Sequence, residues 1–464
     1  MPYLRPLCAA LLVALLLTAC DPFDEGSSSI EGQSSPPPGT PVAAGTDSAE
    51  RIALGGDTLV RGMALLGERY VGGADVPRLL AAGQRGAWTA IAQSGVLPRD
   101  VEAPPEQGAL ADSLGGFRNR YVRTAQRYAS KIDPVWLSNQ MLRQAADSLD
   151  DCHTGFLSAK QVRDQAQRMS GSTRFGGVGV IIRRAPDNNG FLVVEVFDGG
   201  PAEKAGLQPG DRVMTVDDEN LAGMGIEQVV QLVRGEEGST VKLGVRRGPA
   251  QSFDVQLVRA QVAAPILKAQ ILDGNVGYLH FYAFPEPLTG QLDQALREFE
   301  RRDVRAVIVD LRDNSGGQLD VVTKVTSRFV ADGPLFQGVS LSGEKTVYQA
   351  DGSYWRAAKP LIVLTNAGTG SGGEIFAAAI KEHRAGLLVG TTTSGCVSTG
   401  QLFPLPDHSA LEIATNRVLS GIGGVELNKV GVSPNVQVPV AKSDDVVTER
   451  EQQLAKALEI IQRG

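Results

Sequence analysis

The stretch Pro360–Glu382, PLIVLTNAGTGSGGEIFAAAIKE, contains the strongest structural signal of the chain. Leu361–Leu364 is a short apolar run with β-branched residues, which predicts a buried strand. Asn366–Gly373 is a glycine-rich turn, and Glu374–Lys381 has the apolar spacing of a helix. Ser371 is therefore expected where a strand turns into a helix.

A serine at such a place can act as a nucleophile. The N–H groups and the positive dipole end at a helix N-terminus can stabilise a developing oxyanion. The glycines on both sides, Gly370 and Gly372, let a substrate backbone approach Ser371 closely. The same residue types also cap helices, so a Gly/Ser-rich helix cap is the alternative interpretation of these residues alone.

The composition describes a long, acidic chain with enough apolar residues for real cores. It has 464 residues, 42% of them hydrophobic, which suits two or three domains. The formal net charge is −7, so we expect no nucleic-acid partner. No cysteine–histidine spacing indicates a zinc site and no phosphate-binding loop motif occurs, so we expect no metal and no cofactor.

The first 20 residues have the pattern of a secretion signal. Arg5 is followed by the apolar run Leu7–Leu17, which is too short to predict a membrane-spanning helix. The following LTAC, Leu17–Cys20, resembles a bacterial lipobox, in which the cysteine is lipidated and becomes the mature N-terminus. An ordinary signal peptide with an incidental cysteine is the alternative. A lipidated Cys20 predicts a bacterial cell-envelope protein, anchored to the membrane and facing the periplasm or the exterior.

The rest of the chain divides by composition and pattern. Residues 21–48 are rich in Ser, Pro and Gly and predict a disordered tether. Residues 49–165 have mainly helical patterns, and residues 166–260 contain short strand-like runs around two short helices. Residues 261–445 alternate strands with helices, and residues 446–464 predict a C-terminal helix. The alternation in 261–445 favours a mainly parallel sheet with its functional groups at the carboxyl ends of the strands.

The segment 166–260 closely resembles a PDZ domain. Its most specific part is Gly199–Asp211, GGPAEKAGLQPGD, whose Pro and Gly residues favour a helical turn and then a tight turn before a strand. PDZ domains bind the C-terminus of a peptide by adding it to a sheet edge. The resemblance assigns carboxylate binding to the loop Phe175, Gly176, Gly177, Val178 and Gly179. Some other small β-rich domain is the alternative.

Together these stretches resemble the C-terminal processing (tail-specific) serine peptidases. The shared order is a D-x-H motif at Asp151–His153, the PDZ domain, a strand followed by R-x-N-x-G-G, and the strand–turn–helix with Ser371. The closing GVSPN, Gly431–Asn435, is similar to the G-I/V-x-P-D of the family. The resemblance implies an α/β (α+β multidomain) protein with a helical N-terminal segment, a β-rich PDZ domain and a mainly parallel protease core of crotonase-like (ClpP-like) type.

The resemblance also implies the activity and its site residues. It implies a serine endopeptidase that cleaves protein tails, with Ser371 as the family nucleophile. The N–H groups of Gly316, Gly317 and Gly372 match the positions that stabilise the oxyanion.

One position departs from the family pattern. The family base is a lysine, but an ungapped alignment places Cys396 there, and no lysine lies between Lys381 and Lys429. A serine needs a neighbouring base, and a cysteine thiol is a poor substitute for a desolvated lysine.

Three interpretations of the missing lysine remain open. In the first, His153 of the D-x-H motif is the base, as a histidine is in the tricorn-like and retinoid-binding-like branch of the family. In the second, the chain is a catalytically inactive, peptide-binding pseudopeptidase. In the third, Cys152 and Cys396 form a disulfide that places the site under redox control, which requires that His153 approach Ser371.

The third catalytic residue and the partners are less defined. Sites of the Ser–His branch include a glutamate before the closing motif; Glu426 is two residues out of register with it, and Asn428 falls closer. The expected partners are protein or peptide C-terminal tails and, through the lipid anchor, a membrane. An oligomer or an adaptor protein is left open.

Overall fold

The structure of the chain is a computed structural model that describes residues 46–96, 113–163, 174–224, 226–263, 265–357, 359–438 and 446–463. The predicted signal peptide with Cys20 lies outside the described residues, as does the predicted tether up to residue 45. Within the described ranges, no helix has the length and apolar character needed to cross a membrane.

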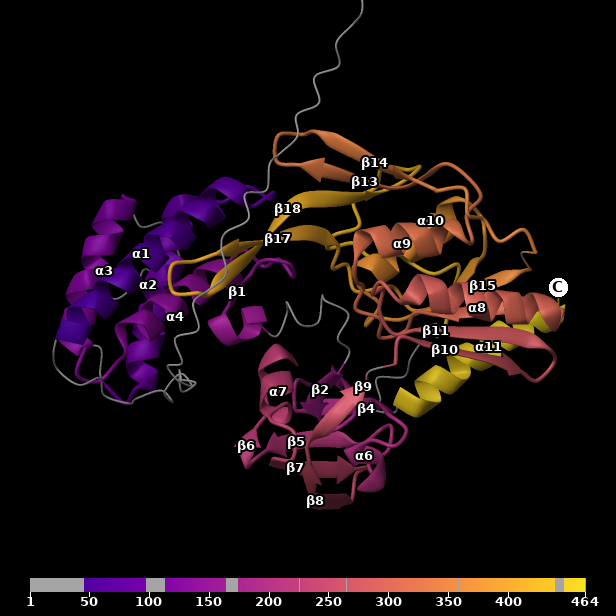
Figure 1. The fold of residues 1–464 in the computed structure, drawn as a ribbon, viewed down its shortest axis with the longest axis horizontal. Coiled ribbons are helices and arrows are strands. Elements are labelled where there is room, and N and C mark those ends of the chain that lie inside the picture. The colour runs from indigo at the N-terminus through magenta and orange to yellow at the C-terminus, as the bar shows by residue number, and fades with distance from the viewer. Residues whose placement is uncertain are drawn as a thin grey trace, which may run out of the picture.

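Among the described residues of the N-terminal region, helices α1 to α4 lie together at one end of the molecule (Figure 1). Asp133 caps the last of them, because its Oδ1 accepts a hydrogen bond from the Trp136 N–H at 2.8 Å, and Pro134 occupies the first turn. The core of this group also contains Leu411 and Ile413 from the protease core, so the helices are packed onto it. The helices are α1 (Thr46–Arg69), α2 (Val76–Gln93), α3 (Leu114–Tyr128) and α4 (Pro134–Asp147).

The middle region is a small β-rich domain, which lies below the protease core in Figure 1. Its main sheet has the order β3-β4-β5-β7-β8, so β3 is an edge strand, and the short β6 (Glu219–Asn220) pairs with β5. Two short helices, α6 (Pro201–Lys204) and α7 (Ile226–Val233), match the predicted ones closely. The sheet strands are β3 (Val180–Arg184), β4 (Phe191–Val196), β5 (Arg212–Val216), β7 (Thr240–Arg247) and β8 (Gln251–Val258).

The protease core is built on a six-stranded sheet of order β10-β11-β12-β15-β16-β19. The β10–β11 pair is antiparallel and all other pairs are parallel, which confirms the predicted mainly parallel sheet. The strands are β10 (Leu267–Leu272), β11 (Val276–Phe281), β12 (Ala306–Asp310), β15 (Leu361–Thr365), β16 (Leu387–Gly390) and β19 (Val436–Gln437).

Helices cover both faces of this sheet. Val307 and Val363 point into the core beneath α8 (Leu288–Arg301), α9 (Leu319–Ser327) and α10 (Gly372–Glu382). Their neighbours Ile308 and Ile362 point to the other face, where α11 (Val446–Arg463) packs through Ala457. Because alternate residues face opposite sides, strands covered on both faces are apolar throughout, which is why β12 and β15 were readily predicted. Leu454, Leu458 and Ile461 of α11 also pack against this face.

A second, antiparallel sheet was not predicted. It has the order β1-β18-β13-β14, with β17 also paired to β18. Strands β14 and β17 are largely exposed, so they show no strong apolar pattern. The members are β1 (Gly155–Leu157), β13 (Pro334–Ser340), β14 (Lys345–Gln349), β17 (Ser398–Pro404) and β18 (Ala410–Ser420).

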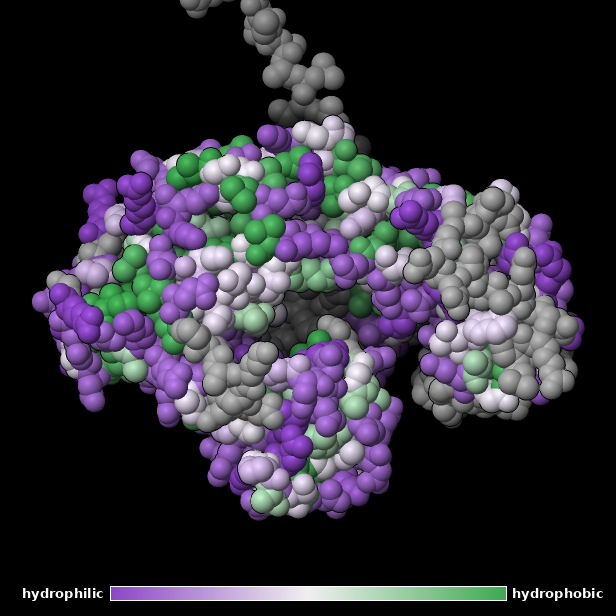
Figure 2. Space-filling model, turned by 180° about the vertical axis from the view of Figure 1, so that it is seen from behind, coloured by the Kyte–Doolittle hydropathy of each residue, from purple (hydrophilic) through white to green (hydrophobic). Residues whose placement is uncertain are grey.

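The face of the molecule turned away from the viewer in Figure 1 is mainly hydrophilic. Hydrophobic residues are interspersed among hydrophilic ones, and this face is hollowed near its centre (Figure 2).

Candidate active site

Ser371 lies at the sharp turn between β15 and α10, as predicted. Its backbone has φ 47° and ψ −116°, a conformation that is unfavourable for a residue other than glycine. The Ser371 N–H donates to the Cys396 carbonyl at 2.9 Å, which fixes this turn against the loop after β16. Strained backbone at a serine before a helix N-terminus is the arrangement that presents a nucleophile to a cleft.

The predicted oxyanion glycines lie directly beside Ser371. A Cβ built on Gly316 would lie 2.9 Å from Ser371 Oγ and 2.7 Å from the Gly372 nitrogen. Gly316 has φ +98° and donates its N–H to the buried Asn314 Oδ1 at 2.8 Å. Because Asn314 engages the Gly316 N–H, Gly317 and Gly372 are the better candidates for oxyanion donors.

His153 is brought to the same cleft as Ser371. The cleft has a volume of about 480 Å³, and both side chains line it together with Gly317, Ser398 and Glu412. Strand β1 begins two residues after His153 and pairs with β18, so this pairing holds the D-x-H loop of the helical region against the protease core. The D-x-H motif and the turn that contains Ser371 therefore line one cleft in the structure.

The surroundings of His153 set its protonation and position. Burial lowers the pKa of His153, while the negative charge of Asp151 acts in the opposite direction. Asp151 Oδ1 accepts the His153 backbone N–H at 2.9 Å. Thr154 Oγ1 in turn accepts the Ala414 N–H at 3.0 Å, which ties the loop to β18. His153 is thus held as a neutral imidazole near neutral pH, which is the form that a general base requires.

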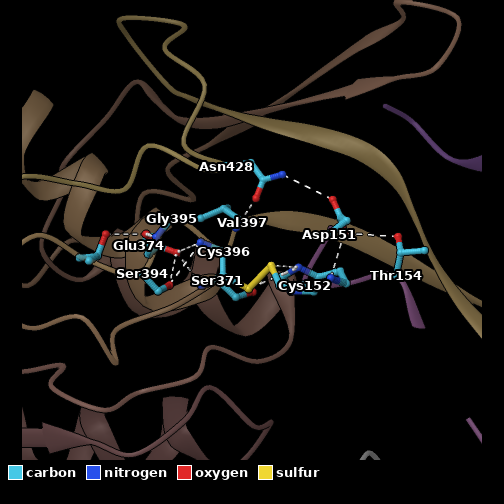
Figure 3. The surroundings of a disulfide bond; sticks show 12 residues. Asp151, Cys152, Thr154, Ser371, Glu374, Ser394, Gly395, Cys396, Val397 and Asn428 are labelled. Atoms are coloured by element: carbon cyan, nitrogen blue, oxygen red, sulfur yellow. Dashed lines mark hydrogen bonds between the residues drawn. A yellow bond between two sulfur atoms is a disulfide. The ribbon is translucent and has the colours of Figure 1, made fainter. Parts of the chain in front are cut away.

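Cys396 is bonded to Cys152 in a disulfide (Figure 3), and this disulfide adjoins His153. The Cα atoms are 5.9 Å apart, although the residues are separated by 244 positions in sequence. His153 Nδ1 lies 3.3 Å from Cys152 Sγ and 3.9 Å from Cys396 Sγ. In this form Cys396 has no free thiol group, so it cannot act as an acid or a base. The predicted catalytic residue Cys396 is instead a covalent link beside the histidine.

Glu374 has a structural role that the sequence analysis missed. Its carboxylate is fully buried and accepts N–H bonds from Gly395 at 2.8 Å, from Cys396 at 2.9 Å and from Ser371 at 3.2 Å. The hydroxyls of Thr393 and Ser394 donate to it as well. A glutamate three residues after the serine at a helix start is the pattern of a capping box, and that signal was available in the sequence.

Asn428 connects the two halves of the site. Its Oδ1 accepts the Val397 N–H at 3.2 Å, and its Nδ2 lies 3.5 Å from Asp151 Oδ2 (Figure 3). Glu426 instead pairs with Arg417 in a partly exposed ion pair at 3.5 Å. The structure therefore places Asn428, rather than Glu426, beside the loop that contains His153.

The predicted peptide-binding loop, Phe175–Gly179, precedes the edge strand β3. Strand β2 (Arg174–Gly177) pairs with β9 (Ala260–Ala263), and Gly179 has φ +81° where the chain turns into β3. Within the loop, the Val178 carbonyl accepts the Ala202 N–H at 2.8 Å. The loop thus runs from the β2–β9 pair to β3, which is an edge strand of the main sheet, and its residues Gly177, Val178 and Gly179 are buried.

The β-rich domain also contacts the loop that contains Gly316. Arg183 of β3 pairs with Asp313 at 3.4 Å and with Glu449 of α11 at 3.0 Å. Arg450 pairs with Asp313 as well, at 2.8 Å. These buried carboxylates keep β3 and the loop after β12 in contact.

Comparison with known proteins agrees with the order of these elements. The profile of peptidase family S41 matches residues 275–438, and that of a PDZ domain matches residues 192–247. The chain is 28% identical over 318 residues to the carboxy-terminal processing protease CtpA of Bacillus subtilis, covering 68% of this chain and 67% of the relative. It is 31% identical over 313 residues to the chloroplastic C-terminal processing peptidase of Tetradesmus obliquus, covering 64% and 67%.

Solved structures show the same architecture. The photosystem II D1 C-terminal processing protease superimposes with a TM-score of 0.54 at 27% identity, covering 79% of this chain and 96% of that one. Mature CPAF complexed with lactacystin gives a TM-score of 0.50 at 13% identity, covering 89% and 98%, and this likeness concerns the fold alone. These matches show that the chain belongs to peptidase family S41 and is a serine-type hydrolase.

Proposed function

We propose that this S41 peptidase is a serine endopeptidase of the C-terminal processing type, with Ser371 as nucleophile and His153 as general base. The observation that carries the proposal is the shared cleft, which both residues line while the usual lysine position is occupied by a disulfide-bonded cysteine. The relatives named above are C-terminal processing proteases, which supports the activity and gives no support to the alternative of an inactive peptide-binding relative.

The chemistry would follow the Ser–His scheme. Ser371 Oγ attacks the scissile carbonyl and transfers its proton to His153, while Gly317 and Gly372 N–H groups stabilise the oxyanion. The imidazolium then protonates the departing amine, and the bond between the carbonyl carbon and nitrogen breaks. Water hydrolyses the Ser371 ester in the second half of the reaction, with His153 again as base. The charge of Asp151 would stabilise the imidazolium in both halves.

The substrate would be the C-terminal tail of a protein. The tail would add to the edge strand β3, with its carboxylate held by backbone N–H groups of the loop Phe175–Gly179, and would extend from there towards Ser371. The lipobox pattern at Cys20 supports a membrane-anchored enzyme of the bacterial cell envelope. An oligomer or an adaptor remains compatible with this scheme.

The test is labelling of the purified full chain with a fluorophosphonate probe, which reports an activated serine. We expect labelling of the wild-type protein, none of Ser371→Ala, and a loss of about a hundredfold or more in rate for His153→Gln. His408→Gln, an exposed-turn histidine elsewhere in the core, is the matched control and should label normally. Full labelling of His153→Gln would remove His153 from the mechanism, and labelling of Ser371→Ala would remove Ser371.

Cleavage of a peptide with a free C-terminal carboxylate completes the test. Cleavage that is abolished in Ser371→Ala and weakened by amidation of the peptide terminus would support tail recognition. A probe-reactive protein that cleaves amidated and free peptides equally well would contradict the assignment of the loop Phe175–Gly179 to carboxylate binding.

A further inference from the structure

Three soft or borderline metal-ligand atoms converge at one wall of the active-site cleft. Cys152 Sγ, Cys396 Sγ and His153 Nδ1 all lie within 4.8 Å of one another. Cys152 is exposed, while His153 and Cys396 are partly buried, so solvent reaches the cluster from one side. The disulfide occupies both sulfur atoms in the present form, so the cluster offers ligands only after its reduction.

The spacing of this cluster suits tetrahedral coordination. With Zn–S near 2.3 Å and Zn–N near 2.0–2.1 Å, a sulfur and a nitrogen on one zinc lie about 3.6 Å apart and two sulfurs about 3.8 Å apart. His153 Nδ1 is already 3.3 Å and 3.9 Å from the two sulfurs. Reduction releases the sulfurs to separate to that distance by side-chain rotation, while the backbones stay in place at a Cα–Cα separation of 5.9 Å.

The loops that carry these ligands are fixed independently of the disulfide. Glu374 accepts the N–H groups of Gly395 and Cys396, and Asp151 accepts the N–H of His153. The pairing of β1 with β18 holds the loop on the helical side. Because hydrogen bonds orient the backbone on both sides, breaking the S–S bond leaves the three ligands facing one another.

We propose that reduction of the Cys152–Cys396 disulfide creates a Cys₂His site for a thiophilic divalent cation of the Zn²⁺ class. A dithiol reductant would attack the exposed Cys152 sulfur, Cys396 would leave as the thiolate, and the second thiol of the reductant would close on the mixed disulfide. Both cysteines are then reduced, and the reductant is oxidised to its own disulfide. The cation binds the two sulfurs and His153 Nδ1 with release of the two thiol protons, and a water from the cleft completes the fourth position.

This site would also control the peptidase, and that part of the inference rests on the proposed function. A metal ion on Nδ1 of His153 fixes the imidazole and places a positive charge beside it. An imidazole coordinated in this way is a far weaker proton acceptor than a free one. The oxidised chain would therefore be the active form, and the reduced, metal-bound chain would be inhibited until a chelator removes the cation.

Cobalt(II) spectroscopy tests the site without any reading of activity. The full chain is reduced with a tertiary phosphine, which is itself oxidised to the phosphine oxide, and is then desalted without oxygen before Co²⁺ is added. We expect one equivalent of Co²⁺ to give a near-ultraviolet thiolate-to-cobalt charge-transfer band and the visible bands of tetrahedral Co²⁺. The oxidised chain should show neither band. Equal bands in the oxidised chain, or none after reduction, would overturn the proposal.

Matched variants separate this site from other cobalt binding. Cys152→Ser should lose most of the charge-transfer intensity, and His153→Gln should weaken binding by roughly tenfold or more, since even outer-shell partners of a metal contribute about 10–100-fold. His408→Gln should bind like wild type. Unchanged affinity in His153→Gln would exclude histidine as a ligand, and circular dichroism checks that each variant is folded. His153→Gln leaves both cysteines in place, so it remains informative if Cys152→Ser does not fold.

Ser371→Ala distinguishes failure of this inference from failure of the proposed function. Ser371 is not a ligand, so the variant should bind Co²⁺ normally even though it cannot react with a fluorophosphonate. In the wild-type chain, Zn²⁺ should abolish probe labelling only after reduction, and a chelator should restore it. If the Co²⁺ bands appear but Zn²⁺ does not inhibit probe labelling, the metal site is supported and its control of Ser371 is refuted.

Discussion

Glu374 Oε2 accepts N–H bonds from both Ser371 and Cys396, so one buried carboxylate fixes the proposed nucleophile and the loop that contains the disulfide-bonded Cys396. The charge lies in the first turn of α10, where the helix dipole favours a negative group. The same carboxylate also accepts hydrogen bonds from the hydroxyls of Thr393 and Ser394 and from the Gly395 N–H. The site is therefore organised around a group that takes no part in the proposed proton transfers.

Replacing Glu374 by Gln should disrupt this arrangement. The new NH₂ group would face N–H donors in place of an acceptor, which should lower the free energy of unfolding by about 2–3 kcal/mol. Probe labelling should fall at the same time, because the turn at Ser371 loses one of its supports. Urea denaturation and labelling rates measure the two effects. Glu426→Gln, which alters only a partly exposed ion pair, should change stability by less than about 1 kcal/mol; equal losses in both variants would contradict the role of Glu374.

A methyl group at Gly316 should block the nucleophile. The Cβ of Gly316→Ala would lie 2.6 Å from Ser371 Cβ and 2.9 Å from its Oγ, at a residue with φ +98°. An alanine at this φ costs about 1–3 kcal/mol of backbone strain, and its methyl group displaces Ser371. Together these effects should abolish labelling of Ser371 by the fluorophosphonate probe. Gly290→Ala provides the control, since a Cβ there meets no atom within 4 Å on helix α8. That variant should label normally and gain up to about 1 kcal/mol in stability; an active Gly316→Ala would show that the turn can move.

The disulfide should make a large contribution to stability. Its sequence separation of 244 residues closes a loop that contains the entire β-rich domain. The chain-entropy account gives roughly 5 kcal/mol for a loop of this length, although native-state effects reduce such values. Thermal unfolding of the full chain in a phosphine reductant should therefore begin at a clearly lower temperature than in the oxidised form. The same melting temperature in both states, with alkylation confirming reduction, would refute this prediction.

The sequence identified those parts of the fold whose residues are apolar on both faces or match a motif. Strands β12 and β15 and the turn at Ser371 belong to this group, because buried parallel strands are continuous apolar runs. The antiparallel sheet escaped prediction because β14 and β17 are largely exposed. The disulfide could be suggested only through the family resemblance, since the pairing of β1 with β18 brings Cys152 and Cys396 together. The partners of Glu374 lie in a polar loop with no periodic pattern, and only the fold shows that it surrounds this carboxylate.

The pH dependence should follow the protonation of His153. Burial lowers its pKa below the ordinary value of 6.5, so labelling should rise with pH and level off by about neutrality. The same shift affects the free energy of unfolding, because the folded state favours the neutral imidazole of His153. This contribution to stability is fully present above pH 6.5 and is lost as the pH falls through the pKa of His153 in the folded state. Asp151→Asn keeps an acceptor for the His153 N–H and removes the charge that opposes the shift.

The rising limb of the labelling profile should therefore move to lower pH in Asp151→Asn, and the plateau rate should fall because the imidazolium loses its negative neighbour. Labelling rates measured across the pH range in wild type, Asp151→Asn and Asp150→Asn give the comparison. Asp150 pairs with Lys429 on the exposed side of the same loop, which makes it a control for general surface charge. A limb that shifts equally in both aspartate variants, or only in Asp150→Asn, would mean that the group titrating in the cleft is not the histidine beside Asp151.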